Sequence, residues 1–437
     1  MFGMPGVHPR GSKNTQGCAT QRIPSPKTVE IPLSMHIGKP CECLVRPGDV
    51  VKKGTCIGGG DAYPSVPVHS SVSGTVKQIA DYTTASGAVV QSVVIESDGQ
   101  DQWDEAIVPP AVDSREGFLK AVRDSGLVGL GGAGFPTWVK LDVKDKPVDY
   151  LLINFAECEP YITSDFRTAV EDTELVFEGI QAVMKYTGAK QCIIGVESNK
   201  PEAVKLLRER ADSLPDVSVK VLKAKYPQGA EKVLIHSLTG RTVHVGKLPL
   251  DVGCLVLNIT SCAFLAAYLK TGRPLVERRL TVDGCVAKPG NYLVPIGTSI
   301  ADVLEAAGGC TQQPEKVIMG GPMMGLAVPT CQTPVLKNNN AILAFSEKMS
   351  RQREESACIR CARCITHCPY SLAPAAIDRA VRAGNVQALL ELNVSACMEC
   401  GCCSYICPAK RHLVERNRLG KQMVRDYLKK EEEMKHA

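Results

Sequence analysis

Two copies of one cysteine pattern stand near the C-terminus, and each has the form C-x2-C-x2-C-x3-C-P. The copies are Cys358, Cys361, Cys364 and Cys368 with Pro369, and Cys397, Cys400, Cys403 and Cys407 with Pro408. In such a pattern three cysteines bind one [4Fe–4S] cluster, and the fourth, next to proline, binds the neighbouring cluster. The sequence therefore predicts two clusters. One has the ligands Cys358, Cys361, Cys364 and Cys407, and the other has the ligands Cys397, Cys400, Cys403 and Cys368.

Structural zinc and disulfide bonds are the two simpler roles for these cysteines. Zinc ribbons use pairs of CxxC knuckles rather than three cysteines in succession followed by a CP. The chain has 20 cysteines and no sequence typical of a signal peptide, which indicates a reducing compartment rather than a disulfide framework. Iron–sulfur clusters are therefore favoured. Cys402 lies between two predicted ligands and is expected to be a spare thiol.

Composition limits the classes of partner. A length of 437 residues suggests three or four domains. The net charge is +5, and the few aromatic residues are not interleaved with basic runs, so nucleic acid is not an expected partner. The longest apolar run, residues 252–269, contains polar residues and barely reaches the ~18 residues of a membrane helix. No direct membrane span is expected.

The first third of the chain predicts an arm and a small β domain. Residues 1–27 are rich in Gly, Pro, Ser and Thr without periodicity, which is typical of an extended arm. Residues 28–105 carry short strands separated by turns. Their segments PGDVVKKG and SSVSGTV resemble the barrel-sandwich fold of biotinyl and lipoyl carriers. The lysine that those carriers modify is missing, so packing or docking is the expected role.

The remaining chain predicts three further units and a tail. Residues 106–275 alternate strands with helices, which indicates a mostly parallel sheet covered on both faces. Residues 276–345 form a smaller β-grasp-like unit, and residues 346–415 a ferredoxin domain with a helical spacer between its two cysteine groups. Residues 416–437 are expected to form a charged, exposed helix. The predicted fold class is a multidomain α/β protein.

A glycine loop in the α/β region is the second candidate for chemistry. Residues 129–134 satisfy G-x-G-x-x-G, but the dinucleotide-binding fingerprint of that spacing needs a strand directly before it, and here a helix is predicted. Glycines still let backbone N–H groups approach a phosphate or a flat ring closely. A flexible hinge is the alternative.

The wider sequence around this loop resembles a known family. GLGGAGFPTWVK at residues 129–140 and NFAECEP at residues 154–160 are similar to the FMN- and NADH-binding core of the complex I flavoprotein subunit. The order of the whole chain resembles more closely the C subunit of the Rnf electron-transport complex. That resemblance covers residues 5–410, and its motifs lie at residues 6–9, 31–38, 69–74, 156–162, 288–292 and 319–325.

The resemblance implies which residues hold the cofactors. Those placed at FMN are Gly129, Gly131, Gly132, Lys140, Asn154, Glu157, Gly229, Glu231 and Asn258. Phe135 would stack near NADH, and Glu159 would lie near the NADH ribose. The glycine-rich segment at residues 320–325 is expected to be a packing turn.

The resemblance also implies a function. The chain would be a peripheral NADH-oxidising subunit on the cytoplasmic side of the cell membrane. It would pass a hydride from NADH to FMN, and then single electrons through two [4Fe–4S] clusters to other subunits of a membrane-bound Rnf complex. That complex links NADH and ferredoxin to ion translocation, which makes the predicted enzyme class a translocase. The direction of electron flow and the coupling ion stay open.

Three alternatives stand beside this prediction. A cobalamin reductase of bacterial microcompartments shares the flavin core and clusters, but typically starts near the glycine loop. A non-catalytic iron–sulfur electron relay would bind no nucleotide. A quinone-reducing sodium-pump subunit shares the N-terminal modules, but its relatives lack the paired cluster motifs.

Overall fold

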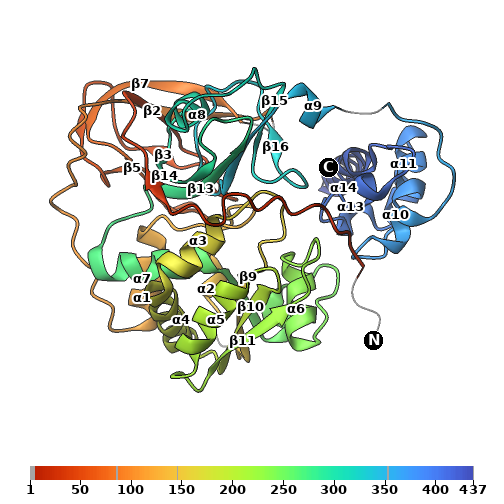
Figure 1. The fold of residues 1–437 in the computed structure, drawn as a ribbon, viewed down its shortest axis with the longest axis horizontal. Coiled ribbons are helices and arrows are strands. Elements are labelled where there is room, and N and C mark those ends of the chain that lie inside the picture. The colour runs from red at the N-terminus through yellow and green to blue at the C-terminus, as the bar shows by residue number, and fades with distance from the viewer. Residues whose placement is uncertain (1–4, 85–86, 145, 352–353, 437) are drawn as a thin grey trace.

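The structure is a computed structural model that describes residues 5–84, 87–144, 146–351 and 354–436. Figure 1 shows three units packed together and a fourth, helical unit at one side. The N-terminal arm crosses the molecule between the upper β units and the lower α/β unit (Figure 1). This arrangement agrees with the predicted multidomain α/β fold.

The first unit is a sandwich of two antiparallel sheets. One sheet has the strand order β2-β8-β7-β4 and the other has the order β3-β5-β6. The strands are β2 Thr28–Pro32, β3 Glu42–Cys43, β4 Val50–Val51, β5 Cys56–Gly59, β6 Val68–His69, β7 Gly74–Thr83 and β8 Val89–Ser97. Val29 and Ile31 alternate with more exposed neighbours along β2 and face the core, the period expected of a half-buried strand.

The α/β unit is built on a parallel sheet of strand order β11-β10-β9-β12. Its elements are α1 Arg115–Asp124, α2 Thr137–Leu141, β9 Tyr150–Phe155, α3 Ser164–Glu171, α4 Thr173–Thr187, β10 Gln191–Glu197, α5 Pro201–Ala211, β11 Val217–Leu222, α6 Glu231–Thr239, the 3-10 turn η1 Pro249–Val252, β12 Cys254–Asn258 and α7 Ile259–Thr271. Helices α4 and α7 pack so closely that a side chain at Gly179 would clash with Cys262 O. The alternation of strands and helices and the parallel sheet expected for residues 106–275 are both present.

The apolar run at residues 252–269 divides into strand β12 and helix α7 at Asn258. The Asn258 side chain caps α7 by accepting a hydrogen bond from Thr260 N at 2.9 Å. Among the residues described, no helix has the length and apolar character needed to cross a membrane.

The third unit is a mixed sheet of order β1-β14-β13-β17-β15-β16. Its elements are β1 Gln21–Arg22, β13 Glu277–Gly284, β14 Gly290–Pro295, α8 Ile300–Ala306, β15 Lys316–Met319, β16 Leu326–Ala327 and β17 Ala341–Phe345. Strand β1 belongs to the N-terminal arm and pairs in parallel with β14. The arm is therefore anchored in this sheet.

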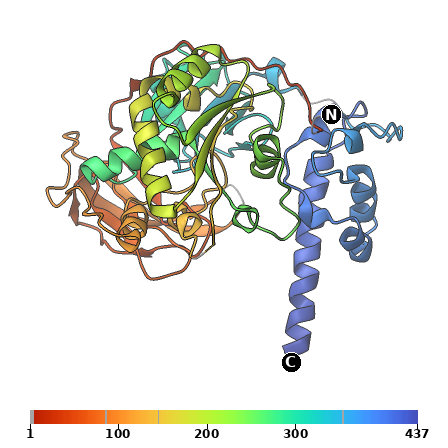
Figure 2. The same cartoon turned by 90° about the horizontal axis from the view of Figure 1, so that it is seen from below.

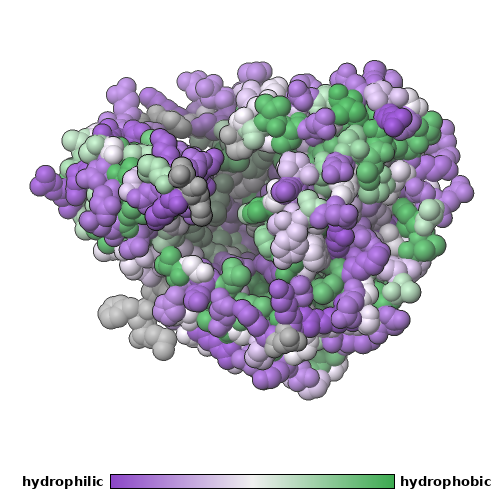
Figure 3. Space-filling view, turned by 180° about the vertical axis from the view of Figure 1, so that it is seen from behind, coloured by the Kyte–Doolittle hydropathy of each residue, from purple (hydrophilic) through white to green (hydrophobic). Residues whose placement is uncertain are grey.

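The fourth unit is the helical cluster module. Its elements are α9 Glu347–Ser350, α10 Arg363–Thr366, α11 Pro374–Arg382, α12 Val386–Glu391, η2 Val394–Ala396, α13 Cys402–Ile406 and α14 Leu413–His436. Gly420 on α14 lies against Val381, Val394 and Leu389 of the module. Beyond this contact α14 extends away from the body, as Figure 2 shows. Seen from behind, the surface is hollowed between the module and the other units (Figure 3).

Candidate cofactor-binding sites

The carboxyl ends of the parallel strands bring two asparagines together. Asn154 at the end of β9 is the register partner of Asn258 at the end of β12. Asn154 Nδ2 donates to Gly229 O at 2.8 Å, and Asn258 Nδ2 donates to Asp165 Oδ2 at 2.7 Å. Ligands of open α/β sheets bind at this edge, so the topology itself forms the candidate flavin site.

The glycine loop lies directly beside these asparagines. A Cβ on Gly131 would lie 2.7 Å from Asn258 Nδ2, whereas a Cβ on Gly132 would meet open space. The base of the loop is closed by a hydrogen bond from Gly129 N to Phe135 O of 2.8 Å. Gly131 and Gly132 are exposed, so their backbone is open to a ligand at the tip of the loop.

Lys140 and Glu231 form an ion pair at the same edge. Lys140 Nζ donates to Glu231 Oε1 at 2.9 Å and to Val256 O at 3.1 Å. The two side chains are 31% and 39% exposed, so this pair contributes little to stability. An accessible ammonium group supplies a cation suited to a phosphate.

Glu157 places a buried carboxylate in the loop after β9. Its Oε1 accepts from Asp165 N at 2.8 Å, while its buried Oε2 has no hydrogen-bond partner among the described residues. Burial raises the pKa of Glu157 above its ordinary value, and the cation of Lys13 opposes that rise. Asp165 in turn accepts from Asn258 beside the glycine loop, so this buried acceptor without a donor fits a polar ligand such as FMN.

Glu159 faces a different neighbour. Its two oxygens accept hydrogen bonds from Met323 N at 3.0 Å and Met324 N at 2.9 Å. Burial raises the pKa of Glu159 to about 7. The turn at residues 320–325 therefore packs on the loop at residues 156–163, called here the acidic loop. A Cβ on Gly321 would clash with Glu159.

The structure gathers most of the flavin residues that the sequence predicts. Five of them are linked into one network by hydrogen bonds, close approach or strand pairing. They are Gly131, Asn154, Glu157, Gly229 and Asn258. Lys140 and Glu231 pair with each other. Phe135 lies at the base of the glycine loop, and Glu159 points toward the 320–325 turn.

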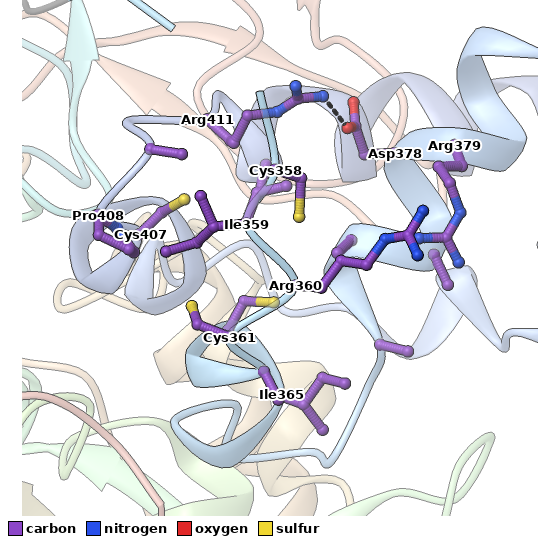
Figure 4. Close-up of a pocket in the computed structure, with 17 residues that line it drawn as sticks. Cys358, Ile359, Arg360, Cys361, Ile365, Asp378, Arg379, Cys407, Pro408 and Arg411 are labelled. Carbon is purple, nitrogen blue, oxygen red and sulfur yellow. Dashed lines mark hydrogen bonds and ion pairs between the residues drawn. The ribbon is translucent and has the colours of Figure 1, made fainter. Parts of the chain in front are cut away.

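The first set of predicted cluster ligands lines one cavity of about 250 Å³, called here the outer cavity. It is lined by Cys358, Cys361, Cys364 and Cys407, together with Ile359, Arg360 and Arg411 (Figure 4). Cys358 and Cys361 are exposed, whereas Cys364 and Cys407 are buried. Arg411 pairs with Asp378 at its rim. Figure 4 shows the arginine side chains around the opening.

The second set lines a narrower cavity of about 20 Å³, called here the inner cavity. Its thiols are Cys368, Cys397, Cys400 and Cys403, and the spare thiol of Cys402 also reaches it. Two N–H groups donate to Cys397 Sγ, Glu399 N at 3.4 Å and Asn417 Nδ2 at 3.3 Å. Hydrogen bonds to sulfur stabilise thiolate ligands and tune cluster potentials.

The chemistry of both donor sets fits a cluster better than a single ion. Within the described ranges, no three His, Cys, Asp or Glu side chains converge as one metal ion requires. A cluster of several irons is larger than one ion, so its thiolates stand further apart around a cavity. Four thiols around each cavity, in the spacing of the two motifs, match that requirement.

The inner cavity adjoins the α/β unit. Tyr226 Oη donates to Cys400 O at 2.8 Å, and Tyr226 is buried together with Val7, Cys400 and Cys402. Tyr370, which lines the inner cavity, has its pKa raised to about 12 by burial and then by the charges of Cys400 and Glu231. Tyr226 also lies three residues before Gly229, whose carbonyl accepts from Asn154, so one short segment joins the inner cavity to the candidate flavin edge.

Sequence reasoning missed two contributors to this region. Lys13 of the arm binds the acidic loop, and Tyr226 links the α/β unit to the module. A lone lysine in a Gly- and Ser-rich arm carries no pattern that would have identified it. Tyr226 opens the segment that contains Gly229 and Glu231, and that place in the sequence was the only available signal.

Comparison with known proteins matches every unit. Residues 4–100 match the RnfC barrel sandwich hybrid domain, residues 122–267 the Nuo51 FMN-binding domain, residues 279–327 the SLBB domain and residues 350–408 the 4Fe-4S dicluster domain. The chain is 40% identical over 380 residues to the C subunit of the proton-translocating ferredoxin:NAD(+) oxidoreductase complex of Clostridium ljungdahlii, covering 85% of this chain and 83% of that protein. The chain belongs to the RnfC family.

Other RnfC proteins are similarly related. The C subunit of the Na(+)-translocating ferredoxin:NAD(+) oxidoreductase complex of Acetobacterium woodii is 40% identical over 84% of this chain and 85% of its own length. The C subunit of the ion-translocating oxidoreductase complex of Salmonella gallinarum is 38% identical over 84% of this chain but only 56% of its own length. An NAD+-reducing [NiFe]-hydrogenase in the air-oxidized state shares the fold, with a TM-score of 0.53 at 21% identity over 71% of this chain and 63% of the other.

These findings confirm the predicted RnfC membership, the fold class and the cofactors FMN and two [4Fe–4S] clusters. They also place the chain among oxidoreductases that are subunits of a larger complex. Membership of the RnfC family sets aside the cobalamin reductase and the sodium-pump protein.

Proposed function

We propose that this chain is the peripheral NADH-oxidising subunit of a membrane electron-transport complex. Bound FMN would supply the hydride acceptance and single-electron release that no side chain of the chain offers. The complex would couple NADH and ferredoxin chemistry to ion translocation through partner subunits, with this chain on the cytoplasmic side of the membrane. The observation that carries the proposal is that Tyr226, three residues before Gly229 at the candidate flavin edge, donates a hydrogen bond to Cys400 O beside the inner cavity.

The residues of this chain would hold FMN by hydrogen bonding and charge. The backbone of Gly129, Gly131 and Gly132 is placed for close approach, and Lys140 offers a cation. The carboxyl and amide groups at the sheet edge would orient the ring system. They are Asn154, Glu157, Glu231 and Asn258, with Gly229 held against Asn154.

NADH would approach from the side of the glycine loop and the acidic loop. Phe135 would supply an aromatic face, and Glu159 would accept from the ribose hydroxyls. A carboxylate has about four acceptor positions, so the hydrogen bonds from Met323 N and Met324 N leave capacity for a ribose. Glu159 would then join NADH to the 320–325 turn.

The two cysteine sets would hold the clusters in sequence. Cys368, Cys397, Cys400 and Cys403 form the set that adjoins the α/β unit, and Cys358, Cys361, Cys364 and Cys407 form the set with exposed members. Electrons would pass from the flavin edge to the inner set, and from the outer set to partner subunits. Ile359, 66% exposed beside the outer cavity, would lie in that contact.

The experiment that tests this function uses the chain purified without oxygen and supplied with FMN. NADH should bleach both the flavin absorbance and the iron–sulfur absorbance of the isolated chain. Two intact clusters with no FMN bound would overturn the proposal and leave the non-catalytic relay.

A further inference from the structure

The N-terminal arm is fastened to several units at once. Val7 pairs with Tyr226 through backbone hydrogen bonds of 2.8 and 3.0 Å, and Tyr161 N donates to Gly11 O at 2.8 Å. Thr15 Oγ1 lies 2.6 Å from Thr163 Oγ1. Together with strand β1, these contacts carry the arm from the cluster module, past the acidic loop, to the β-grasp sheet (Figure 1).

Lys13 is the charged centre of this path. Its Nζ donates to Glu157 O and Glu159 O, both at 2.8 Å, and to Ile162 O. Its three ammonium protons thus have three carbonyl acceptors, all from one loop. The Lys13 side chain is 15% exposed, and its ammonium lies 3.8 Å from Glu157 Oε2.

The loop that Lys13 binds has no regular secondary structure of its own. Residues 156–163 form no helix or strand, and the carbonyls of Glu157, Glu159 and Ile162 accept from Lys13 instead of from a helix or strand. Tyr161 has a left-handed φ of 70°, a conformation that costs energy for a residue other than glycine. A cation that binds three carbonyls offsets that cost and defines the course of the loop.

Lys200 is a second lysine that contacts this loop. Its Nζ is bonded to Glu197 Oε2 at 3.3 Å and Asn199 Oδ1 at 3.2 Å, and is 3.4 Å from Glu157 O. Removing Lys13 would take the lysine donor from Glu159 O and Ile162 O and leave Glu157 O with Lys200 alone. The Glu157 carboxylate would lose its nearest arm cation. Each buried acceptor left unsatisfied costs about 1 to 3 kcal/mol in proteins generally.

We propose that Lys13 is a positioning residue for the nicotinamide and flavin site, and that the arm is a strap that holds the acidic loop in its binding conformation. This inference rests on the proposed function, because it assigns Glu157 and Glu159 to the ligands. It goes further because it makes Lys13, which is distant in sequence and has no predicted ligand contact, responsible for the positions of Glu157 and Glu159.

The test compares Lys13→Met with Lys27→Met in the full chain carrying FMN and both clusters. Methionine keeps an unbranched apolar side chain and removes the donors, and Lys27 is an exposed lysine just beyond the arm's contacts. In Lys13→Met we expect faster backbone hydrogen exchange at residues 157–163. We also expect a KM for NADH raised about ten-fold and a more negative flavin midpoint potential, because a nearby cation is lost. Iron content should match that of wild type.

The result that would overturn the inference is a Lys13→Met chain equal to Lys27→Met in hydrogen exchange, KM and flavin potential. If Lys13→Met fails to fold, Lys13→Arg replaces it. Arginine keeps the charge but not the compact three-carbonyl fit, so the KM should rise while the flavin potential stays near that of wild type. An unchanged KM in Lys13→Arg would also overturn the inference. A wild-type chain that binds no FMN would instead contradict the proposed function, so the two failures are distinguishable.

Discussion

The two cysteine sets have the same spacing in the sequence and differ in their surroundings. The outer cavity has two exposed cysteines and an arginine-rich rim, whereas the inner cavity is narrow and is buried against Tyr226 of the α/β unit. The exposed Ile359 next to the outer set contrasts with the buried Cys402 next to the inner set. The repeat therefore gives two chemically equal sites, and packing gives each one a different neighbour.

Position along an electron path is therefore a property of the fold and not of the cysteine motif. Electron transfer favours short separations, so the cavity that touches the flavin-binding unit is suited to receive electrons. The cavity open to solvent is suited to exchange them with another protein. The following substitutions test whether the two cavities differ in this way.

The largest effect is expected from Cys400→Ser. A serine oxygen is a poor cluster ligand, so the inner cluster should be lost and the iron content should fall by about half, as one of two four-iron clusters. Iron and FMN analysis of the purified chain would check this, with FMN content unchanged. Cys402→Ser is the matched control and should keep all its iron. Loss of iron in Cys402→Ser with full iron in Cys400→Ser would instead make Cys402 the cluster ligand.

Lys140→Met should slow the reduction of both clusters by NADH equally, because Lys140 lies at the candidate flavin edge, from which electrons would reach both clusters. Loss of the ammonium beside Glu231 should weaken FMN binding and lower kcat/KM for NADH by about a hundred-fold, the scale of one lost charged contact. Chemical reduction by dithionite should still reduce both clusters. Iron loss in this variant would mean that Lys140 supports the fold rather than the flavin.

Glu159→Gln tests the contact between the acidic loop and the 320–325 turn, which borders Gly401 beside the inner cavity. The pKa of Glu159 is raised from 4.5 to about 7, so the folded chain holds this proton more tightly than the unfolded chain. The Glu159 contribution to stability should therefore fall as pH rises from about 4.5 to 7, by on the order of 3 kcal/mol, and glutamine should remove that contribution.

Urea unfolding at pH 5 and pH 8 would measure this pH dependence. The exposed Glu305→Gln serves as the control and should keep the pH dependence of wild type. If Glu159→Gln and wild type had equal pH dependence, the raised pKa assigned to Glu159 would be wrong.

The smallest effect is expected from Tyr226→Phe, which removes one buried hydrogen bond to Cys400 O. The cost should be about 1 kcal/mol, with a small shift in the potential of the inner cluster alone. Tyr292→Phe removes a comparable bond to Lys288 O in the β-grasp unit and should shift neither cluster. Redox titration followed by electron paramagnetic resonance would separate the two clusters. An equal shift of both would remove the distinction between inner and outer.

The features of the fold and of the candidate sites that depend on a local sequence pattern could be predicted from the sequence. The cysteine spacing predicted two sets of thiols, which the fold places around two separate cavities. Alternating strands and helices predicted the parallel sheet that brings Asn154 next to Asn258. Contacts between distant segments carry no such pattern. Lys13 lies 144 residues from Glu157, and Tyr226 lies 174 residues from Cys400. Neither spacing is periodic, so only the folded chain brings these residues together.

The most direct test of the account is the order in which NADH reduces the two clusters in the isolated chain. Freeze-quenched samples of wild type and Cys400→Ser, followed by electron paramagnetic resonance, would measure reduction of the outer cluster. If electrons reach the outer cluster through the inner one, NADH reduces the outer cluster in wild type, and this reduction is lost or slowed by orders of magnitude without the inner cluster. Equally fast reduction of the outer cluster in Cys400→Ser would contradict that route.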